Sequence, residues 1–369
     1  MANTIIQNQA IGQSTWIDFI QRSMLTTGKL GELVKQGVTG LTSNPTIFEK
    51  AVSTTTDYDE ALREFAGSDA SATDIFEAIA VEDIQGAADI LRTVYDHTDG
   101  RDGYASLEVP PALAHNTQST VREALRLQSL LHRPNVMIKV PATAAGIPAI
   151  RALIAEGINV NITLIFSVDT YQQVIDAYIS GLEDIALAGK DPSRVASVAS
   201  FFVSRIDTAV DAALRASGAD ASLTGATAVA NARAAYALFQ QAFTSERFAV
   251  LRAKGARPQR PLWASTSTKD PSLPDTLYVD QLIGVDTVNT MPPATLDATL
   301  DHGTSVETLS GTAALAAQHL EAIAAAGIDL HAVTAKLLSD GLDSFAKSFD
   351  DLLAGIDAKR GQLSQVTQL

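Results

Sequence analysis

Short apolar runs alternate with amphipathic stretches along most of the chain. Residues 136–141 read VMIKVP, a nearly continuous apolar run of the kind found in strands buried on both faces. In residues 145–156 the apolar positions recur at helical spacing, and Gly157 follows as a stop signal. Residues 159–166 form the next apolar run. A strand, a helix and a strand at this spacing predict a parallel βαβ unit.

The same alternation of short runs and helical stretches extends over the whole chain. It predicts eight strands, at residues 14–20, 38–41, 104–110, 136–141, 159–166, 195–203, 260–266 and 287–291. None of these runs is followed by a Gly-rich dinucleotide fingerprint. The pattern therefore favours an α/β fold, an eight-stranded parallel (β/α)8 TIM barrel with additional helices.

The chain is longer than a minimal barrel, which takes about 250 residues. We expect one TIM-barrel domain over residues 1–369, with the surplus in helical insertions at about 46–103 and 224–255. Further helices are expected at the C-terminus, at about 305–360. The stretch 305–359 is expected to be helical throughout, with short breaks at Gly327 and around Gly341.

Composition excludes several classes of function. The net charge is −15 and no basic run occurs, which argues against nucleic-acid or anionic-membrane partners. No apolar segment approaches the length of a membrane span, and the N-terminus does not resemble a signal peptide. The chain has no cysteine, and its six histidines show no metal-binding spacing. We therefore expect no metal or other cofactor and a cytoplasmic location.

One lysine, Lys139, interrupts the buried run 136–141. A buried lysine costs several kcal/mol unless it is paired or neutral. One interpretation is a structural ion pair, or a side chain whose stem reaches out of the strand end. The other is an amine that stays partly neutral, attacks a carbonyl and forms a Schiff base. The lysine and its strand alone leave both interpretations open.

Polar residues near the ends of the other predicted strands make the second interpretation stronger. In a parallel barrel these side chains gather at one face. They are Asp18, Asn44, Glu108, Lys139, Asn161, Thr163, Ser200, Arg205 and Ser265. Taken singly, Asp18 could also be a helix N-cap, and the Asn44-Pro45 pair a simple turn. Convergence from seven strands on one amine favours a catalytic site.

Four motifs resemble the transaldolases, a Schiff-base-forming family of the class I aldolase superfamily. IKVPAT, followed about twenty residues later by GINVNITLIFS, resembles their Schiff-base strand and the strand after it. Upstream, GVTGLTSNPTIFEKAV resembles their asparagine-bearing second strand. Downstream, VASVASFFVSRID resembles the strand that ends in their phosphate-binding arginine. The motifs follow the family's order between Asp18 and roughly Pro292.

The resemblance implies an enzyme of the non-oxidative pentose phosphate pathway. It would transfer a three-carbon dihydroxyacetone unit from sedoheptulose 7-phosphate or fructose 6-phosphate to glyceraldehyde 3-phosphate or erythrose 4-phosphate. Lys139 would attack the ketone, and the protonated imine would then accept electrons during carbon–carbon cleavage. The expected partners are these sugar phosphates alone, and the protein would be a monomer or a homodimer.

The resemblance also assigns roles to individual residues. Asp18 would handle the proton of the hydroxyl at the cleaved bond. Glu108 would act through a water positioned with Thr163 while the imine forms and hydrolyses. Asn44 and Asn161 would hold the three-carbon fragment until the acceptor arrives.

The expected phosphate site departs from the family pattern. Arg205 would bind the phosphate together with the hydroxyl of Ser265. Two further substrate-binding residues are expected on the strand that leads to the arginine, Ser200 and Phe202. Shorter transaldolases carry a second arginine two positions after the serine, where this chain has Ser267. Lys269 is the candidate substitute, and Arg260 is the less favoured one.

Two rival functions remain open on the sequence. A Schiff-base aldolase on the same fold would release free dihydroxyacetone instead of transferring it. A non-catalytic sugar-phosphate-binding barrel would need neither Lys139 nor Glu108, so the presence of both disfavours it. A product assay with and without an acceptor aldose phosphate separates the transferase from the aldolase.

Overall fold

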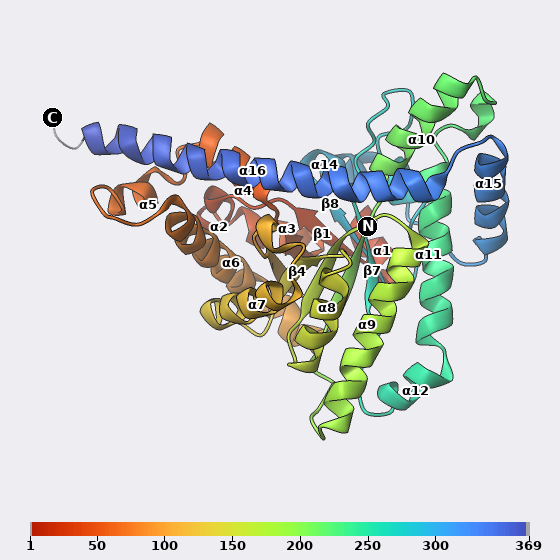
Figure 1. The fold of residues 1–369 in the computed structure, drawn as a ribbon, viewed down its shortest axis with the longest axis horizontal. Helices are drawn as coiled ribbons and strands as arrows, with labels where there is room; N and C mark the ends of the chain where they lie inside the picture. The colour runs from red at the N-terminus through yellow and green to blue at the C-terminus, as the bar shows by residue number, and fades with distance from the viewer. Residues whose placement is uncertain (1, 367–369) are drawn as a thin grey trace.

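A closed barrel of eight parallel strands forms the centre of the structure, a computed structural model that describes residues 2–366 (Figure 1). The strands pair in chain order, and β8 returns to β1. They are β1 (Gln13–Asp18), β2 (Val38–Thr42), β3 (Tyr104–Glu108), β4 (Val136–Pro141), β5 (Val160–Ile165), β6 (Ser197–Phe202), β7 (Arg260–Ala264) and β8 (Thr287–Met291). The predicted (β/α)8 TIM barrel is confirmed.

Helices occupy every connection between the strands. Those up to β5 are α1 (Thr4–Ile11), α2 (Arg22–Thr26), α3 (Lys29–Gln36), α4 (Pro45–Thr54), α5 (Asp59–Glu64), α6 (Ala72–His97), the 3-10 turn η1 (Pro111–Leu113), α7 (Thr117–Leu131) and α8 (Gly146–Ala155). After β5 come α9 (Val168–Leu187), α10 (Ser204–Ser217), the 3-10 turn η2 (Ala221–Leu223), α11 (Thr227–Phe243), α12 (Glu246–Arg252), α13 (Leu277–Asp280), α14 (Pro293–His302), α15 (Ala313–Ala325) and α16 (Leu330–Val366).

Two expectations about the C-terminal part were wrong. Residues 303–312 are not helical, and the Thr308 N–H donates to the Ile283 carbonyl at 2.9 Å instead of continuing a helix. There is also no break at Gly341, because a glycine inside a helix costs only about 1 kcal/mol. A Cβ at Gly341 would lie 3.0 Å from Leu164 Cδ2, so the glycine lets α16 pack closely on β5.

Helix α16 runs across one end of the barrel in Figure 1. It packs along α4, and Thr46 Oγ1 donates to Ser348 Oγ at 2.8 Å. Further along, Lys359 forms an ion pair with Asp59 at 2.7 Å. These contacts fix α16 over the carboxyl ends of the strands, where the active sites of such barrels lie. Within residues 2–366 no single helix is long and apolar enough to cross a membrane, although α15 and α16, bent by 93°, pass that test as a pair.

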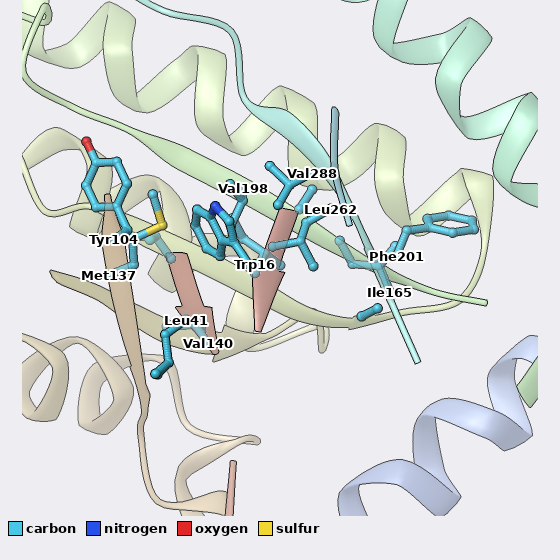
Figure 2. Packing of buried hydrophobic residues seen from close by; sticks show 14 of the residues in the cluster. Trp16, Leu41, Tyr104, Met137, Val140, Ile165, Val198, Phe201, Leu262 and Val288 are labelled. Carbon is cyan, nitrogen blue, oxygen red and sulfur yellow. The ribbon is translucent and has the colours of Figure 1, made fainter. Parts of the chain in front are cut away.

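The interior of the barrel is packed with large apolar side chains. Figure 2 shows Trp16 among Val198, Leu262 and Val288, which come from three other strands. All four are fully buried. Gly40 pairs with Trp16 on the neighbouring strand, and a Cβ there would overlap the indole ring. The barrel is therefore solid below its mouth.

A polar cluster closes the amino end of the barrel. Asp102 accepts hydrogen bonds from Trp16 Nε1, at 2.7 Å, and from the hydroxyl of Ser14. Arg260 Nη1 donates to Ser14 Oγ at 2.7 Å, and its Nη2 lies 3.6 Å from Asp102. Arg260 is 5% exposed, and its charge is matched by this carboxylate. Arg260 therefore has a structural role, and it lies at the end of β7 that is opposite to the mouth of the barrel.

Candidate active site

A polar pocket of about 250 Å3 lies at the carboxyl ends of the strands, beside Phe345 of α16. Nine of the eleven predicted site residues line it: Asp18, Asn44, Lys139, Thr163, Ser200, Phe202, Arg205, Ser265 and Lys269. The other two, Glu108 and Asn161, lie beside Lys139 in the strand register of β3, β4 and β5. Side chains alternate between the two faces of a strand, so residues at matching positions of neighbouring strands point the same way.

Lys139 is held at the base of this pocket. Its side chain is 5% exposed, and its Nζ lies 3.2 Å from Glu108 Oε2. The Nζ also donates to the backbone carbonyl of Ser43, at 2.9 Å, at the end of β2. The lysine therefore neither reaches into solvent nor lacks partners, and its amine is fixed where a ligand in the pocket would meet it.

A second carboxyl group, that of Asp18, lies close enough to Lys139 to interact with its charge. Asp18 ends β1 and is not a helix N-cap, because Gln21 caps the following helix. Its Oδ1 accepts from Thr42 Oγ1 at 2.6 Å, and Thr42 Oγ1 lies 2.7 Å from Thr290 Oγ1. This hydroxyl pair ties Asp18 to the strands on both of its sides.

The protonation of both carboxyl groups is perturbed by burial. Burial raises the pKa of Asp18, while the charge of Lys139 and the Thr42 hydrogen bond act against that rise. Burial likewise raises the pKa of Glu108, opposed by Lys139 and assisted by the charge of Asp18. Two buried carboxyl groups with raised pKa values near one amine are suited to accepting and donating protons.

Two buried oxygen atoms near the amine have few or no polar contacts within residues 2–366. They are Oγ1 of Thr163, which has no polar contact at all in this range, and Oε2 of Glu108, whose one polar contact there is the ion pair with Lys139 at 3.2 Å. Buried polar atoms in proteins nearly always find a partner, in the protein or in water. Their position fits a water or a substrate hydroxyl bound between Thr163 and Glu108.

Asn161 belongs to a chain of hydrogen bonds across three strands. Its Nδ2 donates to Ser106 Oγ at 3.1 Å, and its Oδ1 accepts from Ser200 Oγ at 2.7 Å. The side chain is fully buried beside Lys139. The network holds both Asn161 and Ser200 in fixed orientations at the base of the pocket.

Asn44 has a structural role and also faces the pocket. Its Oδ1 accepts from the Ile47 N–H at 3.0 Å, which makes Asn44 the N-cap of α4, and Pro45 takes the first helical position. Its Nδ2 group donates no hydrogen bond to any other residue in the described part of the chain. Asn44-Pro45 is therefore the start of a helix and not a simple turn, and the amide group of Asn44 remains as a donor for a ligand.

Three cations surround the outer part of the pocket. Arg205, Lys269 and Lys50 all line it, and the charges of Arg205 and Lys50 both act on Lys269. Burial, followed by these two charges, lowers the pKa of Lys269, and burial lowers the pKa of Arg205. Among residues 2–366 none of the three forms an ion pair with a carboxylate. Three unpaired cations on one pocket indicate an anionic ligand.

The backbone around these cations is strained. Ser265 follows β7 with φ of +56°, and Leu164 has φ of +59° at an irregularity of β5. Ser265 Oγ lies 3.0 Å from Ser204 Oγ, next to Arg205. The guanidinium of Arg205 lies over the Phe202 ring, 5.3 Å from its centroid. Such strain in non-glycine residues is typical of functional sites.

Four further residues of the pocket were not among the candidates predicted from the sequence: Thr42, Lys50, Thr290 and Phe345. The threonines could have been found, because each shares the inward face of its strand with a core position two residues earlier. Lys50 and Phe345 could not, because their places depend on how α4 and α16 pack over the barrel. In the described part of the chain no group of three His, Cys, Asp or Glu side chains could hold a metal ion.

Comparison with known proteins identifies the family of this barrel. The sequence model of the transaldolase/fructose-6-phosphate aldolase family matches residues 15–356. A transaldolase of Saccharopolyspora erythraea is 50% identical over 356 residues, which cover 96% of both chains. A transaldolase of Thermobifida fusca is 50% identical over 357 residues, 96% of this chain and 97% of the relative. One from Mycolicibacterium smegmatis is 48% identical over 358 residues, 96% of both chains. The chain therefore belongs to the transaldolase/fructose-6-phosphate aldolase family.

Proposed function

We propose that this chain is an enzyme with transaldolase activity, which moves a dihydroxyacetone unit between sugar phosphates through a Schiff base on Lys139. The observation that carries the proposal is the buried Lys139 amine, 3.2 Å from Glu108 and within the electrostatic influence of Asp18. Family membership and the names of the relatives support the same activity.

The first half of the reaction forms the imine. The neutral amine of Lys139 attacks the ketone carbon of the donor, and the carbinolamine then loses its hydroxyl group as water. A water held between Glu108 and Thr163 would relay the protons, since Glu108 lies beside the amine and the buried Thr163 hydroxyl has no hydrogen-bond partner among the described residues. Hydrolysis of the imine at the end of the cycle uses the same groups in reverse.

The second half breaks and remakes a carbon–carbon bond. Asp18 takes the proton of the hydroxyl next to the bond, and the aldose phosphate leaves as its aldehyde. The electron pair of the broken carbon–carbon bond forms the enamine double bond, while the C=N electron pair moves to the nitrogen. The three-carbon enamine then attacks the acceptor aldehyde, and Asp18 returns the proton to the new hydroxyl. Asn44, Asn161 and Ser200 would bind the hydroxyl groups of the fragment and keep it on Lys139 meanwhile.

The phosphate groups of donor and acceptor would be bound by the three cations of the pocket. Arg205 offers a planar fork, and Ser265 adds a hydroxyl. Lys269 and Lys50 would together replace the second arginine of the shorter transaldolases. In a chain with net charge −15, the overall field repels anions, so these local cations must supply the attraction.

Removal of the cations should weaken binding of phosphorylated sugars without slowing the chemical step. Arg205→Ala, Lys269→Ala and Lys50→Ala should each raise KM for donor and acceptor, by about tenfold or more where a charged hydrogen bond of roughly 1.5 to 3 kcal/mol is lost. Lys190→Ala, an exposed lysine in the loop after α9, is the control and should change neither KM. Unchanged KM values in both Lys269→Ala and Lys50→Ala would remove these two lysines from the phosphate site.

The transferase and the aldolase are separated by the products. With fructose 6-phosphate as donor, we expect sustained turnover only when an acceptor aldose phosphate is present, and little free dihydroxyacetone. Chromatographic quantification of both products tests this directly. Equal turnover without an acceptor, with stoichiometric release of dihydroxyacetone, would assign the aldolase activity instead.

We also propose that the chain acts as a single domain in the cytoplasm, as a monomer or a homodimer. A closed barrel whose connections all carry helices supports one domain. The net charge of −15 argues against nucleic acid or an anionic membrane as a partner, and the local cations of the pocket support sugar phosphates.

A further inference from the structure

A second cavity, of about 390 Å3, lies at the amino ends of β4, β6 and β7. Its floor is formed by Met137, the second residue of β4, and by Ser197 and Val198, the first two residues of β6. Four of its twelve lining residues are arginines, and only one is acidic. Such a lining stands out in a chain whose net charge is −15.

This cavity is separate from the catalytic pocket, and the two have no lining residue in common. Arg260 lies at the start of β7, and Ser265 of the catalytic pocket follows the end of the same strand. At about 3.3 Å per residue, these positions are about 17 Å apart along the strand. The packed barrel interior around Trp16 lies between them.

Positive charge exceeds negative charge around the cavity. Arg257 and Arg194 share one carboxylate, that of Asp99, at 3.1 and 3.5 Å. Arg101 pairs with Asp286 at 2.7 Å.

Two further arginines that line the cavity, Arg260 and Arg252, differ in their partners. Arg260 has its own carboxylate, Asp102, in the polar cluster at the amino end. Arg252 has no carboxylate partner among the described residues, and its guanidinium lies over the Phe248 ring instead. With Arg101, Arg194 and Arg257, these two make five arginines, which have only three aspartates as partners within residues 2–366.

Three of the lining guanidinium groups retain most of their donors. Within residues 2–366, Arg101, Arg252 and Arg257 each donate through Nη2 alone, to Asp286, to the Phe243 carbonyl and to Asp99. Their Nε and Nη1 groups make no hydrogen bond to the protein there. A guanidinium with free neighbouring N–H groups binds the oxygens of a phosphate in a two-pronged geometry. The side chains of Arg101 and Arg257 are 51% and 26% exposed, so an anion can reach them from solvent.

We propose that this cavity is a second anion site, which binds a phosphate-bearing small molecule through Arg101, Arg252 and Arg257. Arg260 completes the floor and is fixed by Ser14 and Asp102. The site is independent of the Schiff-base chemistry, because its residues come from the opposite end of the barrel.

Isothermal titration with pyrophosphate, at constant ionic strength set with chloride, tests this proposal. The titration uses the full chain carrying Arg205→Ala and Lys269→Ala, which weakens the catalytic pocket. We expect one saturable site to remain. Adding Arg252→Ala or Arg257→Ala should weaken that site by about tenfold or more, as expected for the loss of a charged hydrogen bond.

Arg194→Ala is the matched control. Like Arg257→Ala, it removes one positive charge that pairs with Asp99. Arg194, however, does not line the cavity. In this variant the affinity for pyrophosphate should stay within about threefold of its value before the substitution. That change is smaller than the tenfold effect, or roughly 1.4 kcal/mol, expected for the cavity arginines. Thermal unfolding of each variant shows that it is folded, and Arg101→Ala replaces any variant that is not. Absence of a remaining site, or equal weakening by Arg194→Ala, would overturn the proposal.

Discussion

Lys139→Arg should lower kcat by about 10⁵-fold or more, the scale of losing a covalent nucleophile, while the barrel remains folded. Arginine stays protonated and cannot form an imine, yet it retains the charge that Glu108 pairs with. The effect should therefore appear in the chemical step and not in stability. Steady-state kinetics with fructose 6-phosphate, alongside thermal unfolding, measures both.

Lys347→Arg is the control for this substitution. Lys347 lies on the outside of α16, where it is 75% exposed and forms an ion pair with Asp351. The same change of side chain there should leave kcat within about twofold, as surface substitutions have little effect. Residual turnover of Lys139→Arg above one per cent of the unmodified enzyme would show that Lys139 is not the nucleophile.

Glu108→Gln and Asp18→Asn should each slow turnover by about 10² to 10⁴, the usual contribution of a positioned acid or base. The step that slows should differ between them. Glu108→Gln removes the carboxyl group next to the amine, so imine formation itself should become slow. Asp18→Asn leaves the amine and Glu108 in place, so the imine should form at nearly the normal rate and cleavage should fail.

Borohydride quenching at early times separates the two variants. Asp18→Asn should accumulate reduced adduct from the donor ketose as fast as the unmodified enzyme does, whereas Glu108→Gln should accumulate it slowly. Thr42→Val provides a second test, because it removes the hydrogen bond that positions Asp18 without touching the carboxyl group. Equal rates of adduct formation in Glu108→Gln and Asp18→Asn would contradict their separate roles.

Much of the barrel could be predicted because local sequence specifies it. The apolar run of β4 and the glycine after α8 fix strand and helix without long-range information, and β8 matches its predicted residues. Lys139 was noticeable because a charge inside a buried run needs a physical reason. Its partner Glu108 lies beside it in the register of β3 and β4, which the order of strands in a parallel barrel supplies.

The parts that could not be predicted depend on packing between distant segments. Gly341 is a helix-weakening residue in sequence, but in the fold it is the point where α16 approaches Leu164. Lys50 reaches the catalytic pocket because α4 packs along α16, a contact between residues about 300 positions apart. Arg260 was the less favoured candidate for the second phosphate anchor, and it points into the opposite end of the barrel. The predicted strand 260–266 already placed Arg260 at an amino end, but its contacts with Ser14 and Asp102 depend on how the strands pack.

The most direct test of the account is to map the covalent intermediate. Full-length enzyme is mixed with fructose 6-phosphate, reduced with borohydride, digested and analysed by peptide mass spectrometry. We predict a single modified lysine, Lys139, carrying a three-carbon unit, and loss of that adduct when erythrose 4-phosphate is added before reduction. Modification of another lysine, or no adduct under conditions where the enzyme turns over, would contradict the assignment of Lys139 as the carrier of the transferred unit.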